Sequence, residues 1–375
     1  MIIGVPAEIK DSENRIAITP SGVKALKDDG HEVMVETDGG VGSGISNEKY
    51  IDAGAEMVDE PAEIFERADM IMKVKEPLPE EYELLQEEQI LFTYLHLAAF
   101  ENLTEVLCKK NITSIAYETI EDEEGNLPLL TPMSEVAGRL ATQAGARFLE
   151  KPQGGNGVLL GGIPGVKPGK VVVIGGGTVG LNATKMAVGL GADVTVLEKS
   201  EEQMRYIDDI FQGRVKTLMS SEYNLHAESS QADLLIGAVL IPGAKAPKLV
   251  TEELLKGMPD GSVFVDVAID QGGIAETSRA TTHSDPVYVE HGVVHYCVAN
   301  MPGAVARTST FGLTKSTIPY AKKLANIGYE KAMLEDMGLA KGLNTYQGEV
   351  TYKAVADAFD MEYTPVEEVL ETFSH

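Results

Sequence analysis

The sequence is poor in cysteine and in basic residues. Its 375 residues include two cysteines, Cys108 and Cys297, so no disulfide framework is expected and a cytoplasmic, reducing location is predicted. Lysine and arginine together number 31 against 58 aspartate and glutamate residues, which gives a net charge of −27. A chain this acidic is expected to bind neither nucleic acid nor an anionic membrane surface.

The sequence also lacks the patterns of a secretory leader and of a membrane span. Its first residues, MIIGVPAEIK, contain no basic leader followed by a long apolar run. The most apolar long stretch, residues 170–198, is interrupted by several glycines and by Lys185 and Asp193. This stretch is therefore interpreted as a strand, a helix and a second strand.

Hydrophobic residues are plentiful, at 43% of the chain. A chain of this length is expected to bury them in two domains of about 120 to 200 residues each. Short β-rich runs alternate with helical patterns over the first third of the chain, and a second alternation begins at KVVVIG, residues 170–175. Such alternation predicts right-handed crossovers and parallel, doubly wound sheets.

Only the second alternation contains a glycine-rich loop, and this difference divides the chain. We predict an α/β fold of two doubly wound, Rossmann-like domains with a cleft between them. Residues 1–127 and 307–375 are expected to form a discontinuous substrate domain whose C-terminal piece is helical. Residues 128–306 are expected to form an NAD-binding domain.

The strongest local motif is Gly175, Gly177 and Gly180, a G-x-G-x-x-G after an apolar strand. The first glycine permits a tight turn, the second lets a pyrophosphate approach, and the third lets helix and strand pack closely. Glu198 ends the next strand, where its carboxylate can accept hydrogen bonds from the adenosine ribose. A carboxylate there repels a 2′-phosphate, so NAD is predicted over NADP, although the cation of Lys199 partly offsets the repulsion.

Three polar residues of the first domain fall where predicted strands end, the edge at which open α/β sheets bind ligands. Arg15 lies in the loop after the first strand, Lys75 ends DMIMKVK, and His96 ends QILFTYL. Two cations and an imidazole suit a small carboxylate substrate. The alternatives are surface charges for the two cations and, for His96 within FTYLHLAAF, a structural ring with a satisfied hydrogen bond.

The second domain places two further polar residues at predicted strand ends. Asp270 ends SVFVDVAID and Asn300 ends VVHYCVAN. If the two edges face each other, a nicotinamide ring and a substrate meet in the cleft. Asp266, within the same run as Asp270, is interpreted as structural, and no metal ligands are assigned.

Many ordered stretches resemble the bacterial L-alanine dehydrogenase family along essentially the whole chain. They are GVPAEIKDSENRIAITP, MKVKEPLPEEY, LFTYLHLA, LLTPMSEVAGR, IGGGTVGLNATKMAVGLGADVT, AVLIPGAKAP, VDVAIDQGGIAET and VVHYCVANMPGAVARTST. The resemblance implies NAD-dependent, reversible oxidative deamination of L-alanine to pyruvate and ammonia by a cytoplasmic homohexamer. It places the substrate-binding residues at Arg15 and Lys75 and the catalytic residues at His96 and Asp270.

The same resemblance implies a set of cofactor contacts, and two of its positions depart from the family pattern. Glu198 stands where the family usually has Asp, and Ala306 replaces a usual Pro, which is expected to loosen the return crossing between domains. Besides the three glycines of the loop, the implied contacts are Ser134, Thr178, Val179, Glu198, Ser220, Val239, Leu240, Asp270, Val298, Asn300 and Met301, together with Arg279, which matches only part of the family.

Two other functions are open at this point. The opening GVPAEIKDSENRIAITP also resembles the nucleotide-binding subunit of a nicotinamide nucleotide transhydrogenase, which passes hydride between two nucleotides. A non-catalytic NAD sensor is the third possibility. Formation of NADH that depends on alanine distinguishes the dehydrogenase from both.

Overall fold

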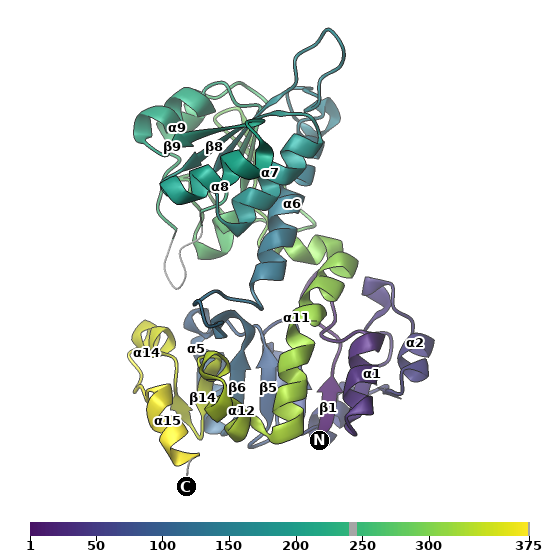
Figure 1. Ribbon diagram of the computed structural model, residues 1–375. Coiled ribbons are helices and arrows are strands. Elements are labelled where there is room, and N and C mark those ends of the chain that lie inside the picture. The colour runs from purple at the N-terminus through teal and green to yellow at the C-terminus, as the bar shows by residue number, and fades with distance from the viewer. Residues whose placement is uncertain (240–245, 374–375) are drawn as a thin grey trace. The chain divides into compact units, whose positions relative to one another are not determined.

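Contacts along the chain group it into two compact units (Figure 1). The structure is a computed structural model that describes residues 1–239 and 246–373. Unit 1 consists of Met1–Met133 and Val305–His375, and unit 2 of Ser134–Ala304. The predicted substrate domain (1–127 and 307–375) and NAD-binding domain (128–306) remain predictions, because contacts do not show what either unit binds.

Unit 1 contains an eight-stranded sheet in the order β15-β14-β6-β5-β4-β1-β2-β3. The six strands from β1 to β6 are parallel, and β14 and β15 join antiparallel beside β6. The C-terminal piece was expected to be helical. This expectation is wrong in part, because β14 and β15 of this piece extend the sheet. The strands are β1 (Ile2–Val5), β2 (Glu32–Glu36), β3 (Glu56–Val58), β4 (Met70–Met72), β5 (Ile90–Thr93), β6 (Thr113–Ala116), β14 (Leu343–Tyr346) and β15 (Glu349–Val350).

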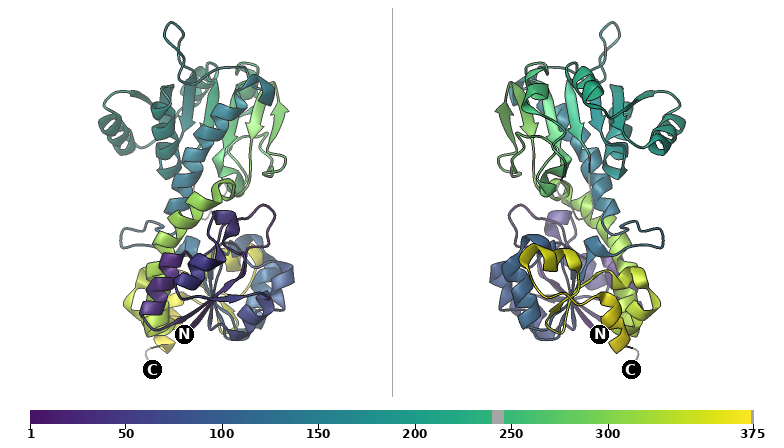
Figure 2. Two further views of the ribbon diagram at one scale, coloured as in Figure 1. Left: turned by 90° about the vertical axis from the view of Figure 1, so that its right-hand side faces the viewer. Right: turned by 90° about the vertical axis from the view of Figure 1, so that its left-hand side faces the viewer.

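The helices of unit 1 lie on both faces of this sheet (Figure 2). They are α1 (Pro20–Asp28), α2 (Asn47–Asp52), α3 (Pro61–Arg67), α4 (Pro79–Tyr82), α5 (Glu101–Lys109), α11 (Ala306–Ile327), α12 (Tyr329–Glu335), α13 (Met337–Ala340), α14 (Lys353–Phe359) and α15 (Val366–Thr372), with 3-10 turns η1 (Val41–Ser43), η2 (Leu97–Ala99) and η3 (Tyr117–Thr119). Ala306, the residue at the usual proline position, is the first residue of α11.

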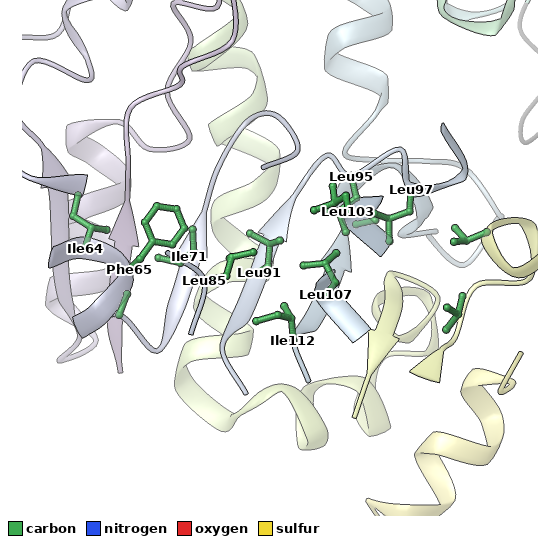
Figure 3. Close-up of a cluster of buried hydrophobic side chains, with 14 of the residues drawn as sticks. Ile64, Phe65, Ile71, Leu85, Leu91, Leu95, Leu97, Leu103, Leu107 and Ile112 are labelled. Atoms are coloured by element: carbon green, nitrogen blue, oxygen red, sulfur yellow. The ribbon is translucent and has the colours of Figure 1, made fainter. Parts of the chain in front are cut away.

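One core cluster of unit 1 joins α3, α5 and α14 to the strands (Figure 3). Phe65 and Leu107 from the helices and Leu91 from β5 are all fully buried. The central strands are apolar on both faces, as parallel strands covered by helices on each side must be. Burial of this kind fixes where each strand ends, and with it the positions of the polar residues that follow.

Unit 2 contains a seven-stranded sheet in the order β12-β13-β11-β10-β7-β8-β9, parallel except for β12. Its strands are β7 (Lys170–Ile174), β8 (Asp193–Glu198), β9 (Val215–Met219), β10 (Leu234–Gly237), β11 (Val263–Asp266), β12 (Val287–Glu290) and β13 (Val293–Tyr296). Its helices are α7 (Thr178–Gly189), α8 (Glu201–Phe211), α9 (Glu222–Ser229) and α10 (Glu252–Lys256), with 3-10 turns η4 (Lys151–Gln153) and η5 (Val267–Gln271). The chain enters through α6 (Thr131–Phe148) and leaves through η6 (Met301–Val305).

Both sheets are doubly wound in the same way. The order β3-β2-β1-β4-β5-β6 in unit 1 is repeated as β9-β8-β7-β10-β11-β13 in unit 2. The prediction of two doubly wound α/β domains, one of them discontinuous, is confirmed, whereas the cleft between them remains a prediction. In the described part of the chain, no helix is long and apolar enough to cross a membrane.

Candidate active site

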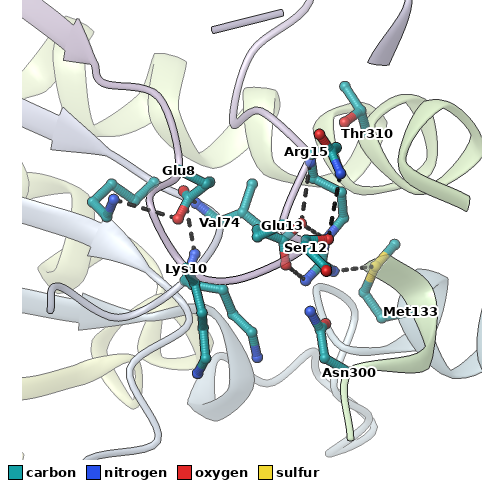
Figure 4. Close-up of polar contacts among 12 residues, drawn as sticks. Glu8, Lys10, Ser12, Glu13, Arg15, Val74, Met133, Asn300 and Thr310 are labelled. Carbon is teal, nitrogen blue, oxygen red and sulfur yellow. Dashed lines mark hydrogen bonds and ion pairs between the residues drawn. The ribbon is translucent and has the colours of Figure 1, made fainter. Parts of the chain in front are cut away.

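Arg15 lies in the loop between β1 and α1, where it is buried with Glu13 (Figure 4). Its Nε donates to Glu13 Oε1 at 2.7 Å and its second terminal nitrogen to Oε2 at 2.5 Å, a two-pronged pair. The first terminal nitrogen contacts the sulfur of Met133 at 3.3 Å. Burial alone would lower the pKa of Arg15, but Glu13 outweighs it and the pKa is raised. The site therefore presents a fixed cation whose orientation is set by a neighbouring carboxylate.

Lys75 follows β4 and is half-buried, and its backbone is tied to the first loop. The amides of Val74 and Lys75 donate to Glu8 Oε1 at 2.6 and 3.4 Å. The side chain of Glu8 is itself buried beside Lys73, with 3.3 Å between Nζ and Oε2, and Lys73 also pairs with Glu81 at 2.7 Å. Burial raises the pKa of the Glu8 carboxyl, and the ammonium of Lys73 opposes that rise. A buried charge network thus holds the segment that carries Lys75.

His96 stands just before η2 with a left-handed backbone, φ 48° and ψ 37°. Its side chain is 43% exposed, and its ring stacks on Tyr94 with 5.9 Å between centroids. The backbone amides of Leu95 and His96 both donate to Glu118, the latter at 2.6 Å, and His96 Nδ1 lies 3.8 Å from Glu118 Oε1. A left-handed non-glycine residue persists only where its surroundings impose it. The exposed ring does not fit a histidine that only fills the core.

The residues described so far in this site follow four neighbouring strands, at one edge of the sheet of unit 1. Arg15 follows β1, Lys75 follows β4, His96 follows β5 and Glu118 follows β6 within η3. The strands β4 and β5 end at Met72 and Thr93, three residues before Lys75 and His96, so both side chains lie in loops beyond the sheet. Sequence reasoning missed Glu118 and Glu13. Glu118 follows the strand-like run in TSIAYETI, which was the signal available for it.

The glycine loop of unit 2 has the geometry that a dinucleotide needs. Gly175 has φ +95°, a conformation that other residues rarely adopt. A Cβ added at Gly180 would lie 1.8 Å from the Gly175 oxygen, whereas one added at Gly177 would meet nothing within 4 Å. The backbone at Gly180 therefore packs tightly against the loop, whereas there is space beside Gly177. Gly177 lies at the N-terminus of α7, whose first residues are Thr178 and Val179. The first backbone N–H groups of a helix have no partner within it, and they suit a phosphate.

Glu198, the last residue of β8, is bound directly to this loop. Its Oε2 accepts from the Gly176 amide at 2.6 Å, and its Oε1 accepts from the amides of Lys199 and Ser200 at 2.6 and 3.0 Å. The amide of Ser220, just after β9, donates to the Glu198 carbonyl oxygen at 2.9 Å. The carboxylate predicted to meet a ribose thus lies beside the glycine loop.

Asp270 lies in η5 and not at the end of a strand, because β11 already ends at Asp266. Its side chain is exposed. Asn300 follows β13 by four residues with φ 65°, and its carbonyl oxygen contacts His283 Nε2 at 3.0 Å. Both residues remain at the carboxyl edge of the sheet, although each lies beyond the strand that was expected to end with it.

The other predicted cofactor contacts that the structure describes occupy the same edge or the first turn of α6. Arg279 is exposed and its guanidinium lies 3.9 Å from the centre of the Tyr288 ring. Leu240 lies outside the described residues. Ser134 is in the first turn of α6, Val239 follows β10, and Val298 and Met301, both buried, follow β13. Among the residues that the structure describes, none form a group of three or more His, Cys, Asp or Glu that could hold a metal ion.

Two domain families match the chain. Residues 4–137 match the family described as "Alanine dehydrogenase/PNT, N-terminal domain". Residues 141–353 match "Alanine dehydrogenase/PNT, C-terminal domain". Together the two matches cover most of the chain.

Relatives and solved structures agree with these matches. The alanine dehydrogenase of Methanococcus maripaludis is 58% identical over 99% of this chain and 100% of its own. That of Bacillus subtilis is 59% identical over 99% of this chain and 98% of its own. A solved L-alanine dehydrogenase, 53% identical, superposes with a TM-score of 0.94 over 96% of this chain and 99% of that one. A transhydrogenase from Sinorhizobium meliloti, 24% identical over 94% and 100%, has a TM-score of 0.82 and shares the fold.

Proposed function

The chain belongs to the alanine dehydrogenase/PNT family, and we propose from this membership that it is an L-alanine dehydrogenase that uses NAD. It interconverts L-alanine with pyruvate and ammonia by transfer of a hydride. The observation that carries the proposal is the edge of unit 1, where Arg15, Lys75 and His96 follow three neighbouring strands in a chain similar to alanine dehydrogenases throughout.

A nicotinamide cofactor fits the residues present in unit 2. The open space at Gly177 and the closed turn at Gly180 make the loop suited to a pyrophosphate, and Glu198 is placed beside it for a ribose. The cofactor, when bound, supplies the hydride acceptor. NAD is proposed over NADP because the Glu198 carboxylate would face the 2′-position. The other proposed contacts are Ser134, Thr178, Val179, Ser220, Val239, Leu240, Asp270, Arg279, Val298, Asn300 and Met301.

Arg15 and Lys75 are proposed to bind the substrate on the side of unit 1. A carboxylate approaching Arg15 meets a guanidinium that already holds Glu13 with two of its nitrogens. The guanidinium of Arg15 is expected to contact the substrate carboxylate, and the ammonium of Lys75 adds a point charge for the carboxylate or the carbonyl oxygen. Glu13 keeps the guanidinium oriented before substrate binds.

His96 is proposed as the general acid and base. Once the α-carbon has lost its hydride, water must add to the imine carbon and ammonia must leave, so one proton has to be removed and another delivered. An imidazole performs both transfers near neutral pH. The ring of His96 is exposed enough to reach substrate. The backbone amide of His96 donates to the carboxylate of Glu118, which holds the residue in place. Asp270 is proposed to orient the water or the amine.

The experiment is a spectrophotometric assay of the purified protein with NAD and L-alanine. Appearance of NADH that requires alanine, with pyruvate and ammonia as products, is expected. Hydride transfer from a second reduced nucleotide without alanine would instead favour a transhydrogenase subunit. Binding of NAD without any turnover would favour a sensor.

The assembly and the location are proposed from the resemblance alone. We expect a homohexamer in the cytoplasm, with Cys108 and Cys297 as free thiols, as the structure has them. Light scattering that gives a mass about six times that of the chain would support the hexamer. A monomer or dimer at working concentration would refute it.

A further inference from the structure

We propose that Asp266 and Lys248 are positioning residues that hold Asp270 in place from opposite ends of the 3-10 helix η5. The inference deepens the proposed function and rests on the role of Asp270 in it. Asp270 is exposed and lies in a helix of five residues. So short a helix is not stable by itself, and an exposed side chain gains little from packing. Its position must therefore be imposed from outside the helix.

Asp266 fixes the N-terminal end of η5. It is the last residue of β11, is fully buried, and accepts the amide of Ala268 at 3.1 Å as the N-cap. Its other oxygen accepts the Ile274 amide at 2.8 Å and the Ser278 hydroxyl at 2.5 Å. One carboxylate thus binds the backbone on both sides of Asp270. Burial raises the pKa of this carboxyl, and these hydrogen bonds oppose the rise.

Lys248 fixes the C-terminal end. Its ammonium donates three hydrogen bonds, to the carbonyl oxygens of Gly272 at 2.6 Å, Gly273 at 2.9 Å and Ala275 at 2.9 Å. Both glycines have positive φ, so this turn directs successive carbonyl groups to one point. Within the described part of the chain, Lys248 forms no ion pair with a carboxylate. All three donors of the ammonium therefore serve the backbone that follows η5.

The two charges match the polarity of the helix between them. A carboxylate at the N-terminus and an ammonium at the C-terminus are each the favourable sign for a helix dipole. The segment before Lys248 adds a backbone bond, from the amide of Ala246 to the Gln271 carbonyl oxygen at 3.0 Å. The short helix is thus held at both ends by groups outside it, which limits how far Asp270 can shift. A displacement of about 1 Å in a catalytic group can lower a rate by about 100-fold.

The test begins with Lys248→Met, which keeps the length of the side chain and removes the ammonium. Because Lys248 is on the surface, the variant is expected to fold with an unchanged melting temperature. Its kcat for alanine should fall about 10- to 100-fold, while its Kd for NADH stays within about threefold. The matched control is Lys256→Met in the same unit, whose ammonium pairs with Glu252 of its own helix and whose kcat should be unchanged. A kcat of Lys248→Met within twofold of wild type, or a protein that melts far below it, would overturn the proposal.

A double variant separates positioning from a general structural role. If Lys248 acts through Asp270, then adding Lys248→Met to a protein that already carries Asp270→Asn should lower kcat by less than about twofold. The carboxylate that Lys248 is proposed to position is already absent from that protein. An undiminished loss in that background would overturn the inference. Lys248→Arg should recover part of the rate, since a guanidinium also donates to several carbonyls.

Asp266→Asn tests the other end of η5. The amide has one acceptor oxygen where the carboxylate has two, so it cannot satisfy the same three donors. The variant should lower kcat, as Lys248→Met does. Normal turnover in a folded Asp266→Asn protein would contradict the proposed positioning role of Asp266. If Asp270→Asn alone keeps normal turnover, the proposed role of Asp270 fails first. That outcome is distinguishable from a failure of the positioning residues.

Discussion

The two units share one strand order but carry different chemical groups at the same place in it. In each sheet the order reverses beside the first strand, between β1 and β4 in unit 1 and between β7 and β10 in unit 2. Ligands of doubly wound sheets bind beyond this point. In unit 1 the loops there carry Arg15 and Lys75, and in unit 2 they carry the glycine loop and Val239. The proposed position of each ligand thus follows from the fold, and the chemistry of the first loop distinguishes the two proposed ligands.

The physical difference lies in what each loop offers. Unit 1 offers charged side chains, and each of them needs neighbours that set its orientation: Glu13 for Arg15, and Glu8 for the backbone of Lys75. Unit 2 offers backbone N–H groups, which need side chains to be absent. Substitutions that remove a charge should therefore weaken ligand binding in unit 1. Substitutions that add side-chain volume should weaken ligand binding in unit 2.

The largest effect is expected at His96, which follows β5 of unit 1. His96→Asn is a suitable change because asparagine tolerates the left-handed backbone found there. The folded variant should bind NADH normally while deamination of alanine falls about 10²- to 10⁴-fold, the usual worth of general acid and base catalysis. Steady-state kinetics together with NADH titration would measure both. Near-normal turnover of the folded variant would mean that the ring is structural.

The next effect concerns the charges of unit 1. Arg15→Ala and Lys75→Ala should each raise KM for pyruvate and alanine, because loss of a charge-assisted contact costs about 2 to 4 kcal/mol, or about 30- to 900-fold. Binding of NADH should change little. The control is Lys24→Ala, which removes only an exposed pair with Asp28 on α1. An equal loss of NADH affinity would assign these residues to the cofactor or to folding.

A pair of glycine variants tests the prediction about volume in unit 2. Gly177→Ala should weaken NADH binding about 10- to 100-fold without loss of stability, because its Cβ meets no protein atom within 4 Å. Gly180→Ala should also lower the free energy of unfolding by about 1 to 3 kcal/mol, because its Cβ would clash with the Gly175 oxygen. Gly189→Ala, later in α7 and open around its Cβ, is the control. Titration with NADH and urea unfolding distinguish the three, and tight NADH binding by Gly177→Ala would refute the loop assignment.

The smallest effect is expected at Glu198, whose charged side chain lies beside the backbone N–H groups of the glycine loop. Wild type should prefer NAD over NADP by about 2 to 3 kcal/mol, or about 30- to 150-fold in kcat/KM. Glu198→Ala should reduce the preference to less than about tenfold, measured with both cofactors in parallel. Equal efficiency of wild type with NAD and NADP would remove the ribose assignment.

The sequence by itself determined the features whose signals are local. Alternating strands and helices predicted two doubly wound sheets, because the period of apolar residues differs between strand and helix. The glycine loop was visible because its three glycines act within six residues of one another. Arg15, Lys75 and His96 were found because each follows an apolar run. Each of these inferences needed only neighbours in the chain.

Only the tertiary structure decided what those residues meet. Glu118 reaches His96 across 22 positions because β5 and β6 are neighbours in the sheet, and Glu8 reaches Val74 across 66 because β1 lies beside β4. The C-terminal strands β14 and β15 were not predicted, since they are stable only as additions to β6. Asp270 was placed in a strand that ends four residues earlier, where the buried carboxylate of Asp266 caps the following turn. Pairings of this kind depend on strand order, which local spacing does not encode.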